Sequence, residues 1–299
     1  MANRKPYGPQ TTDEDISTRF LFVNTDVRGN LLRADDTYLE LVAPHDYPDR
    51  LKRLVGEFLA GALLLSETIK FDGRLLLQAR TDGPIRMIMA EANNRHEVRA
   101  LARMDESQPL EGDFPVLFYG GTLAVIVESA RGESYQSLVP LNGANLAECL
   151  EHYFVQSEQL NTMIRLYADE QSAGGLLLQQ LPPQRVPDKK LRDNQWEHLS
   201  ILARTVTTSE MKELSHLDMI RRLFVEEDIE IYEPRGVRFA CSCNERRLAN
   251  SLITLGQDEL ASLFAETPIL KLTCEFCQVV YEFDENRLLA LVRGRQDTH

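Results

Sequence analysis

The stretches Cys241-Ser242-Cys243 and Cys274-Glu275-Phe276-Cys277 decide how the end of this chain folds. Strand-like runs at 269–273 and 279–283 flank the second pair of cysteines, which predicts that this pair forms the tip of a hairpin. Two close pairs of thiols are typical of a metal site in a reducing compartment. Four thiolates suit a tetrahedral zinc ion. We therefore predict that one zinc per chain is bound by four ligands, Cys241, Cys243, Cys274 and Cys277.

The residues around these cysteines predict a small module over 241–299. Asn244 is a suitable N-cap for a helix through position 252, and Gly256 is a plausible stop. Further helices are predicted at 258–265 and 286–292. So short a segment buries little apolar surface, and a structural zinc site contributes about 10–16 kcal/mol to folding. Loss of the metal should therefore unfold the module.

Spacing alone leaves two interpretations of this zinc site open. The ion can be permanent and purely structural, although the single residue in Cys-x-Cys is a shorter gap than is usual between structural zinc ligands. Alternatively, cysteines so close together can be oxidised to disulfides, and each disulfide removes two zinc ligands. A thiol–disulfide enzyme would place Cys-x-x-Cys at the start of a helix within a βαβ unit. Here the motif lies between two strands, which favours metal binding.

Composition limits the remaining function classes. The 299 residues suggest about two domains. A hydrophobic content of 43% and a charged content of 26% are those of a globular protein. The net charge of −13 argues against a broad nucleic-acid-binding surface. The polar N-terminus and the shortness of the apolar run 58–65 predict neither a signal peptide nor a membrane span. No nucleotide-binding glycine motif and no His-Glu-x-x-His motif is present.

Residues 1–187 are expected to form an α+β domain in which strands meet mainly in antiparallel pairs. A helix at 145–159 places Cys149 on an apolar face, so this cysteine is interpreted as a small buried hydrophobic residue. A second helix is expected at 48–69, with its own apolar face. Strands are predicted at 18–23, 74–81, 85–91, 97–103, 123–128 and 135–139.

Residues 188–240, hereafter the linker, follow a proline-rich boundary at 182–187. Their pattern is helical from 194 to about 228, with an apolar stripe that includes Trp196, and Thr207 and Ser215 begin capping-box patterns. Such short amphipathic helices must dock on a neighbour. The linker is either an ordinary connector or a metastable element held in place by the folded zinc module, which would expose its apolar stripes if the module unfolded.

The chain resembles the 33 kDa chaperonin family (heat-shock protein 33), which consists of redox-regulated holdase chaperones. The likeness lies in the cysteine motifs followed by VVYEF, and in YPDRLKRLVGEFLAGALLL, LVPLNGANLAECLEHYFVQSEQL, GGLLLQQLP and RRLFVEEDIEIYEP. It extends over nearly the whole chain. Thr81-Asp82-Gly83-Pro84 departs from the glycine-rich turn that the family tends to carry, and the run 97–101 lacks a glycine often found there.

The resemblance implies an ATP-independent chaperone of the cytoplasm rather than an enzyme. Its partners would be unfolding client proteins, and oxidation would promote formation of a homodimer. It also implies that the oxidised form carries the disulfides Cys241–Cys243 and Cys274–Cys277, that zinc leaves, and that the module and the linker unfold. The alternative is an adaptor protein whose zinc merely staples the module and does not respond to oxidation.

Overall fold

The computed structural model describes residues 15–68, 72–130, 132 and 134–293. The chain divides into two compact units, Met1–Phe239 and Ala240–His299. The first unit contains almost all of the linker together with the N-terminal domain. The predicted three-part division at 187 and 240 stays a prediction. The expected α+β class, with antiparallel sheets, helices and a C-terminal group of four cysteines, is confirmed.

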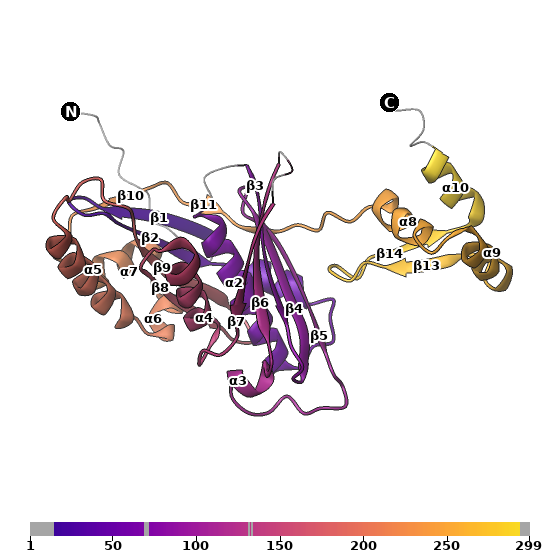
Figure 1. Ribbon diagram of the computed structural model, residues 1–299, viewed down its shortest axis with the longest axis horizontal. Coiled ribbons are helices and arrows are strands. Elements are labelled where there is room, and N and C mark those ends of the chain that lie inside the picture. The colour runs from indigo at the N-terminus through magenta and orange to yellow at the C-terminus, as the bar shows by residue number, and fades with distance from the viewer. Residues whose placement is uncertain (1–14, 69–71, 131, 133, 294–299) are drawn as a thin grey trace. The chain divides into compact units, whose positions relative to one another are not determined.

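Two sheets form the framework of the first unit (Figure 1). The first sheet has the order β10-β1-β2-β9-β8, and β11 also pairs with β1. The second sheet has the order β12-β5-β4-β3-β6-β7. Neighbouring strands are antiparallel except β12 and β5, which are parallel. The strands of the N-terminal domain are β1 Ile16–Phe22, β2 Val27–Arg33, β3 Gly73–Arg80, β4 Ile85–Asn93, β5 Glu97–Met104, β6 Thr122–Ser129, β7 Ser134–Pro140, β8 Thr162–Ala168 and β9 Ala173–Gln180.

Helix α2 (Asp49–Ser66) contacts both sheets and lies at the centre of the main core. Its buried residues include Leu51, Val55 and Phe58, which repeat at the spacing of a helix face. The prediction of this helix is confirmed, although it ends at Ser66, and position 69 lies outside the described residues. The other helical elements of the domain are α1 Asp35–Val42, α3 Phe114–Leu117, α4 Leu146–Tyr153 and the π-helix η1 Phe154–Glu158.

Strand predictions succeed in the second sheet and are incomplete in the first. The predicted strands that became β3 to β7 carry turn residues between them and are confirmed. Strands β2, β8 and β9 are not predicted, because both faces of β2 and β9 are buried and they lack a polar–apolar alternation. Cys149 on α4 is fully buried in the main core, as expected.

The linker helices cover the face of the first sheet opposite α2 (Figure 1). They are α5 Lys189–Arg204, α6 Thr208–Glu213 and α7 His216–Leu223. The sheet serves both cores because alternate residues point to opposite faces: Leu32 packs toward α2, and Leu31 packs toward the linker. Leu199 is buried in this second core and Trp196 is partly buried beside it. The apolar stripe expected in the linker is therefore docked.

The last part of the linker is extended rather than helical. Strands β10 (Ile229–Ile231) and β11 (Arg235–Gly236) pair with β1, and β12 (Arg238–Phe239) pairs with β5. The sequence does not predict these strands, because a segment of two or three residues is too short to show the periodicity of a strand. The linker therefore ends by adding two short strands to the first sheet and one to the second.

The second unit is a small α+β module built on one hairpin. Its elements are α8 Glu245–Ile253, α9 Gln257–Glu266, β13 Leu270–Thr273, β14 Val280–Phe283 and α10 Glu285–Arg293. The predicted helices and hairpin are confirmed. Asn244 caps α8 as expected, whereas Gly256, with a φ of 96°, is the N-cap of α9 rather than the stop of α8. Among the described residues, the buried apolar side chains at the centre of this core are Ala249, Leu252, Phe283 and Leu288.

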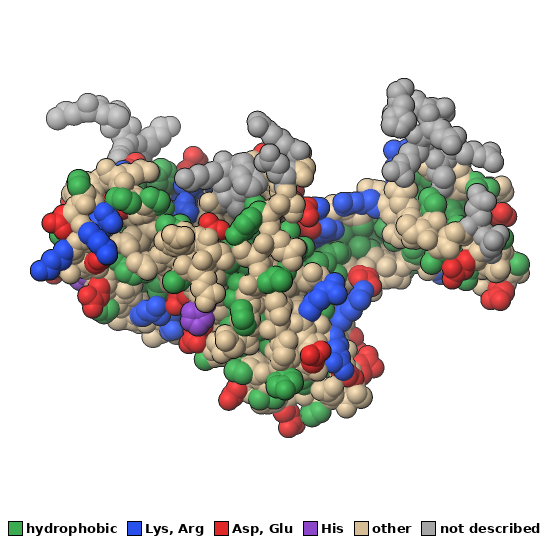
Figure 2. Space-filling view, viewed as in Figure 1, with side chains coloured by type: hydrophobic (Ala, Val, Ile, Leu, Met, Phe, Trp, Pro, Cys, Tyr) green, Lys and Arg blue, Asp and Glu red, His purple; other side chains and the backbone are tan. Residues whose placement is uncertain are grey.

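Acidic and basic side chains are interspersed on the face of the first unit that Figure 2 shows. No broad basic surface is visible there. This distribution agrees with the net charge of −13.

Candidate metal centre

The four cysteines of the two motifs converge at one point of the module. Their sulfur atoms all lie within 4.8 Å of one another. The Sγ atoms of Cys241 and Cys274 are 3.6 Å apart, and those of Cys243 and Cys277 are 3.4 Å apart. All four are free thiols rather than disulfides. The structure thus brings together every predicted ligand, and it leaves Cys149 in the core of the other unit.

The hairpin fixes the second cysteine pair. Strands β13 and β14 pair from Leu270–Phe283 to Thr273–Val280. Beyond the last pair, the N–H of Cys274 donates to the carbonyl of Val279 and the N–H of Gln278 donates to the carbonyl of Cys274. Gln278 has a φ of 56°, so the chain reverses through a left-handed residue. This tight turn directs both sulfurs of the pair to the same side.

The start of helix α8 fixes the first cysteine pair. The side chain of Asn244 accepts a hydrogen bond from the N–H of Arg247, and the Arg247 guanidinium donates to the carbonyl of Ser242. Ser242, between the two cysteines, is therefore tied to the helix that follows. The Tyr281 hydroxyl on β14 lies 3.2 Å from the sulfur of Cys243. A side chain of the hairpin other than its cysteines thus also contacts the loop that carries the first cysteine pair.

The sulfur positions fit a tetrahedral zinc ion. Zinc–sulfur bonds of about 2.3 Å require sulfurs about 3.8 Å apart. The two distances above, and the limit of 4.8 Å for the whole set, bracket that separation. A set of four thiols without histidine or carboxylate is a soft donor set that favours zinc over magnesium or calcium.

The four thiols differ in their readiness to ionise when no metal is considered. Burial raises the pKa of Cys241 and Cys277. Cys274 is also buried, but hydrogen bonds from the N–H groups of Cys277 and Phe276, together with the neighbouring thiols, outweigh burial and lower its pKa. The nearby thiol of Cys243 raises the pKa of Tyr281 to about 12. The backbone of the hairpin turn therefore favours the thiolate form of Cys274, the form that binds metal.

The interface between the linker and the first sheet contains functional candidates that sequence reasoning missed. Arg33 on β2 is 2% exposed and donates 2.9 Å hydrogen bonds to the carbonyls of Met211, Lys212 and Leu214. These carbonyls belong to the C-terminal end of α6, where they have no partner within the helix. A buried cation from the sheet therefore caps a linker helix.

His216 is the second polar group buried in this interface. Its Nδ1 lies 2.8 Å from the hydroxyl of Thr18 on β1. Burial, and then the charge of Arg33, lower the pKa of His216 to about 3. The imidazole is therefore neutral at physiological pH.

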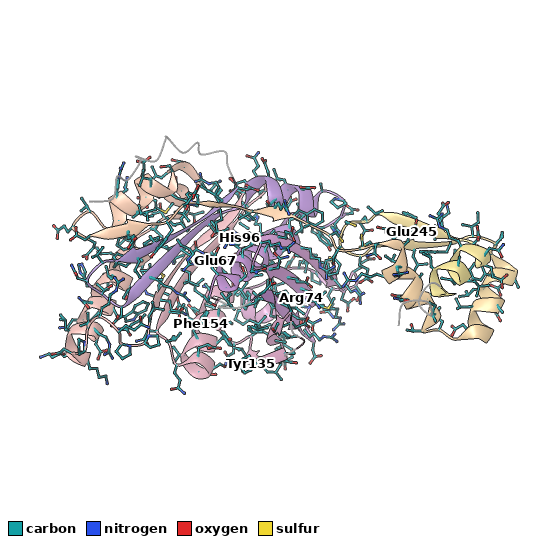
Figure 3. The ribbon with its side chains drawn as sticks, turned by 90° about the horizontal axis from the view of Figure 1, so that it is seen from above. Glu67, Arg74, His96, Tyr135, Phe154 and Glu245 are labelled. Carbon is teal, nitrogen blue, oxygen red and sulfur yellow. The ribbon has the colours of Figure 1, made fainter. Side chains whose placement is uncertain are left out.

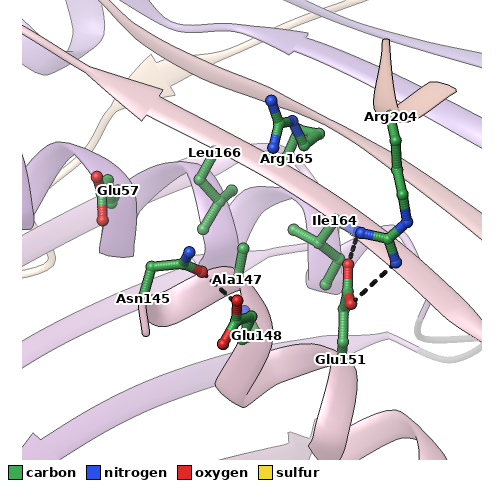
Figure 4. Close-up of a pocket in the computed structure, with 9 residues that line it drawn as sticks. All are labelled: Glu57, Asn145, Ala147, Glu148, Glu151, Ile164, Arg165, Leu166 and Arg204. Atoms are coloured by element: carbon green, nitrogen blue, oxygen red, sulfur yellow. Dashed lines mark hydrogen bonds and ion pairs between the residues drawn. The ribbon is translucent and has the colours of Figure 1, made fainter. Parts of the chain in front are cut away.

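Ion pairs at the rim join the linker to the N-terminal domain. Lys212 of α6 pairs with Asp169. Arg204 at the end of α5 pairs with Glu151 of α4 at 3.3 Å (Figure 4). Glu57 of α2 lines the same pocket of about 210 Å³, and burial raises its pKa to about 7.

The end of the linker rests on a turn that carries a buried ion pair. Glu67, after α2, contacts His96 in the turn between β4 and β5, and both are almost fully buried (Figure 3). Arg238 of β12 donates its N–H to the carbonyl of His96, and Arg235 donates to the carbonyl of Asn94. Burial opposes ionisation of Glu67, yet its pKa is lowered because the hydrogen bond and charge of His96 prevail.

No helix in the described ranges is both long and apolar enough to cross a bilayer.

Known proteins of one kind match this chain over nearly its whole length. The chain is 41% identical over 284 residues to a 33 kDa chaperonin of Pseudomonas fluorescens, a match that covers 94% of this chain and 95% of the relative. It is 43% identical to the 33 kDa chaperonin of Azotobacter vinelandii, with 95% and 96% covered.

The fold also matches a solved structure. The crystal structure of the 33 kDa chaperonin homologue from Thermotoga maritima superposes with a TM-score of 0.79 at 23% identity, covering 95% of this chain and 99% of that one. At this identity the match shows the fold. Finally, the family model described as "Hsp33 protein" matches residues 15–284. The chain belongs to the Hsp33 family of chaperones.

Proposed function

We propose that this protein is a redox-regulated, ATP-independent holdase that binds unfolding proteins under oxidative stress in the cytoplasm. The observation that carries the proposal is the cluster of four free cysteine sulfurs in a module with a very small apolar core. Cys241, Cys243, Cys274 and Cys277 would hold one zinc ion as thiolates in the reduced, inactive form. Metal binding would then supply much of the folding free energy of the module.

Oxidation would remove the ligands in pairs. A thiolate attacks peroxide, which gives a sulfenic acid and hydroxide, and a neighbouring thiolate then displaces a second hydroxide to form the disulfide. Formation of each disulfide transfers two electrons from two thiolates to one peroxide molecule. We propose the pairs Cys241–Cys243 and Cys274–Cys277, which lie within the 4.8 Å cluster. Two such bonds would leave no thiolate for zinc.

Unfolding of the module would then release the linker. The linker buries apolar residues of α5, α6 and α7 on the first sheet, including Leu199, Met211 and Ile220. Once undocked, both the helices and the sheet would present this surface to unfolding client proteins. The same newly exposed surface supports the proposal that oxidised chains form a homodimer. Membership in a chaperone family agrees with a binding role rather than an enzymatic one.

Light scattering from thermally unfolded citrate synthase, without ATP, tests the proposal. The chain is added either reduced and zinc-loaded or after peroxide treatment with mild warming, and zinc release is followed with a chromogenic chelator. Suppression of scattering by the oxidised form alone is the expected result. Equal suppression by both forms would mean a chaperone without this switch. No suppression after confirmed zinc release would instead favour a zinc-stapled adaptor.

Two cysteine variants sharpen this experiment. Cys274→Ser removes one proposed ligand and should weaken zinc retention and abolish normal redox control. Cys149→Ser is the matched control, because Cys149 is buried in the core of the other unit and should leave the stoichiometry of one zinc per chain unchanged. Equal zinc affinity and switching in both variants would refute the assignment of the site.

A further inference from the structure

The first unit contains a cavity of about 680 Å³ that the proposed function does not use. It opens where α2 ends, between the two sheets and η1, and apolar side chains such as Leu75, Val127, Phe154 and Leu181 line it. Tyr135 and Phe154, labelled in Figure 3, come to it from β7 and η1. Its volume lies in the range of cavities that hold small organic ligands, about 300–1,000 Å³.

Arg28 is the cation that lines this cavity among the described residues. Its guanidinium donates a 2.6 Å hydrogen bond to the side-chain oxygen of Gln179. Within the described ranges Arg28 forms no ion pair, and the nearby carboxylate of Glu67 is already engaged by His96 and Arg19. Burial, and then the charge of Arg19, lower the pKa of Arg28 to about 10. The charge of Glu67 offsets part of this effect without forming an ion pair with Arg28, and a bound anion would stabilise the half-buried guanidinium further.

Among the described residues, one carboxylate lines the cavity, that of Glu158, and it is more exposed than Arg28. Glu158 is exposed and accepts a 2.8 Å hydrogen bond from the Tyr153 hydroxyl. Water and this hydroxyl therefore stabilise its negative charge. No ion pair within the described residues joins Glu158 to Arg28, so this carboxylate does not neutralise the guanidinium by direct contact. An anionic group has its favourable position beside Arg28.

The wall formed by η1 has an unusual backbone. Phe154–Glu158 is a π-helix, and the next residue, Gln159, has a φ of 55°. Short π-helical turns occur frequently at functional sites, and a left-handed conformation is strained for a residue other than glycine. Phe154, Ser157 and Glu158 of this segment all line the cavity. The irregular backbone thus shapes the wall opposite the strands.

We propose that this cavity binds a small anionic amphiphile, namely a medium-chain carboxylate. The carboxylate lies against the guanidinium of Arg28, and the hydrocarbon chain lies among Leu75, Val127 and Phe154. The site belongs to the N-terminal domain and does not require oxidation. It is therefore independent of the proposed holdase activity.

Isothermal titration of the full-length, reduced and zinc-loaded chain tests this site with three probes of equal length: decanoate, decanol and decylammonium. We expect decanoate to bind one per chain and at least tenfold tighter than either other probe. Binding of decylammonium as tight as that of decanoate would overturn the proposal, because it would place the head group at Glu158. Non-saturating binding, or no binding of decanoate, would overturn it as well.

Two variants locate the ligand. Arg28→Gln should remove the tenfold preference for decanoate and leave binding of decanol unchanged. Leu181→Trp, at the cavity wall beyond β9, should block all three probes without removing the cation. Circular dichroism and the zinc stoichiometry establish that each variant is folded. If Arg28→Gln does not fold, Leu181→Trp alone decides, since unaltered decanoate binding in that variant would refute the site.

Discussion

Thr18 and His216 are 198 positions apart in the chain, yet the Thr18 hydroxyl lies 2.8 Å from Nδ1 of His216 inside the linker interface. The contact joins β1 of the first sheet to the start of α7. Arg33 lies on the neighbouring strand and its positive charge opposes protonation of the histidine. The docked linker therefore contains a neutral histidine that an undocked linker would expose to water.

We predict that acid weakens docking of the linker on the first sheet, because the pKa of His216 is lowered in the docked state. The docked pKa is about 3, whereas an exposed histidine titrates near 6.5. The undocked state therefore binds more protons below pH 6.5. The contribution of neutral His216 to the free energy of linker docking is present above that pH and is lost as the pH falls. At pH 5.5 the loss is about 1.4 kcal/mol. The protection factors of the amides in α5–α7 of the reduced, zinc-saturated chain, which correct for the pH dependence of intrinsic exchange, should be lower at pH 5.5 than at pH 7.5.

The matched variants are His216→Gln and His198→Gln. Glutamine does not titrate, so His216→Gln should remove the pH dependence. His198 is exposed beside Glu227, and its replacement should leave the pH dependence intact. An identical acid response in His216→Gln would assign the effect to other groups.

Arg33→Met should release the linker without oxidation. The substitution leaves the carbonyls of Met211, Lys212 and Leu214 without the buried Arg33 donor, which costs about 2–4 kcal/mol. Suppression of client aggregation by the reduced, zinc-loaded variant is the expected result. Arg204→Met is the control: its pair with Glu151 is half exposed and worth less than about 1 kcal/mol. If both variants stay inactive until oxidised, Arg33 does not hold the linker.

Phe283→Ala should weaken metal binding although residue 283 is not a ligand. Phe283 is fully buried in the small module core, and truncation of a buried ring costs about 3–5 kcal/mol. Because metal binding and folding of the module are coupled, the apparent zinc affinity should fall by about a hundredfold or more. A competition titration with a chelator measures it. Val280→Ala, at a site 52% exposed, should change the affinity little.

The pairing of the oxidised cysteines can be read from tryptic peptides. Cleavage after Arg246 and Lys271 separates the two motifs. Disulfides Cys241–Cys243 and Cys274–Cys277 would leave two peptides, each lighter by two hydrogens. A single cross-linked species would instead show bonds between the motifs, such as Cys241–Cys274, whose sulfurs are 3.6 Å apart in the reduced form.

The sequence predicts the metal centre better than it predicts the linker interface. All four candidate ligands lie in motifs of three or four residues, and a hairpin and a helix cap orient them locally. Arg33 and His216, in contrast, acquire their roles from partners about 180 to 200 positions away. The periodicity of apolar residues in a sequence does not indicate contacts between residues so far apart in the chain. The strand pairing of β10 and β12 escapes prediction for the same reason.

The pairing of β10 with β1 and of β12 with β5 has a further consequence. In the order of the two sheets, β1 and β5 would be outermost strands if the linker were absent. Undocking of the linker would then uncover rows of backbone N–H and C=O groups as well as apolar side chains. Such rows can accept any extended polypeptide as an additional strand, because main-chain hydrogen bonds do not depend on side-chain identity. Recognition through the peptide backbone would let a single chain hold clients of unrelated sequence.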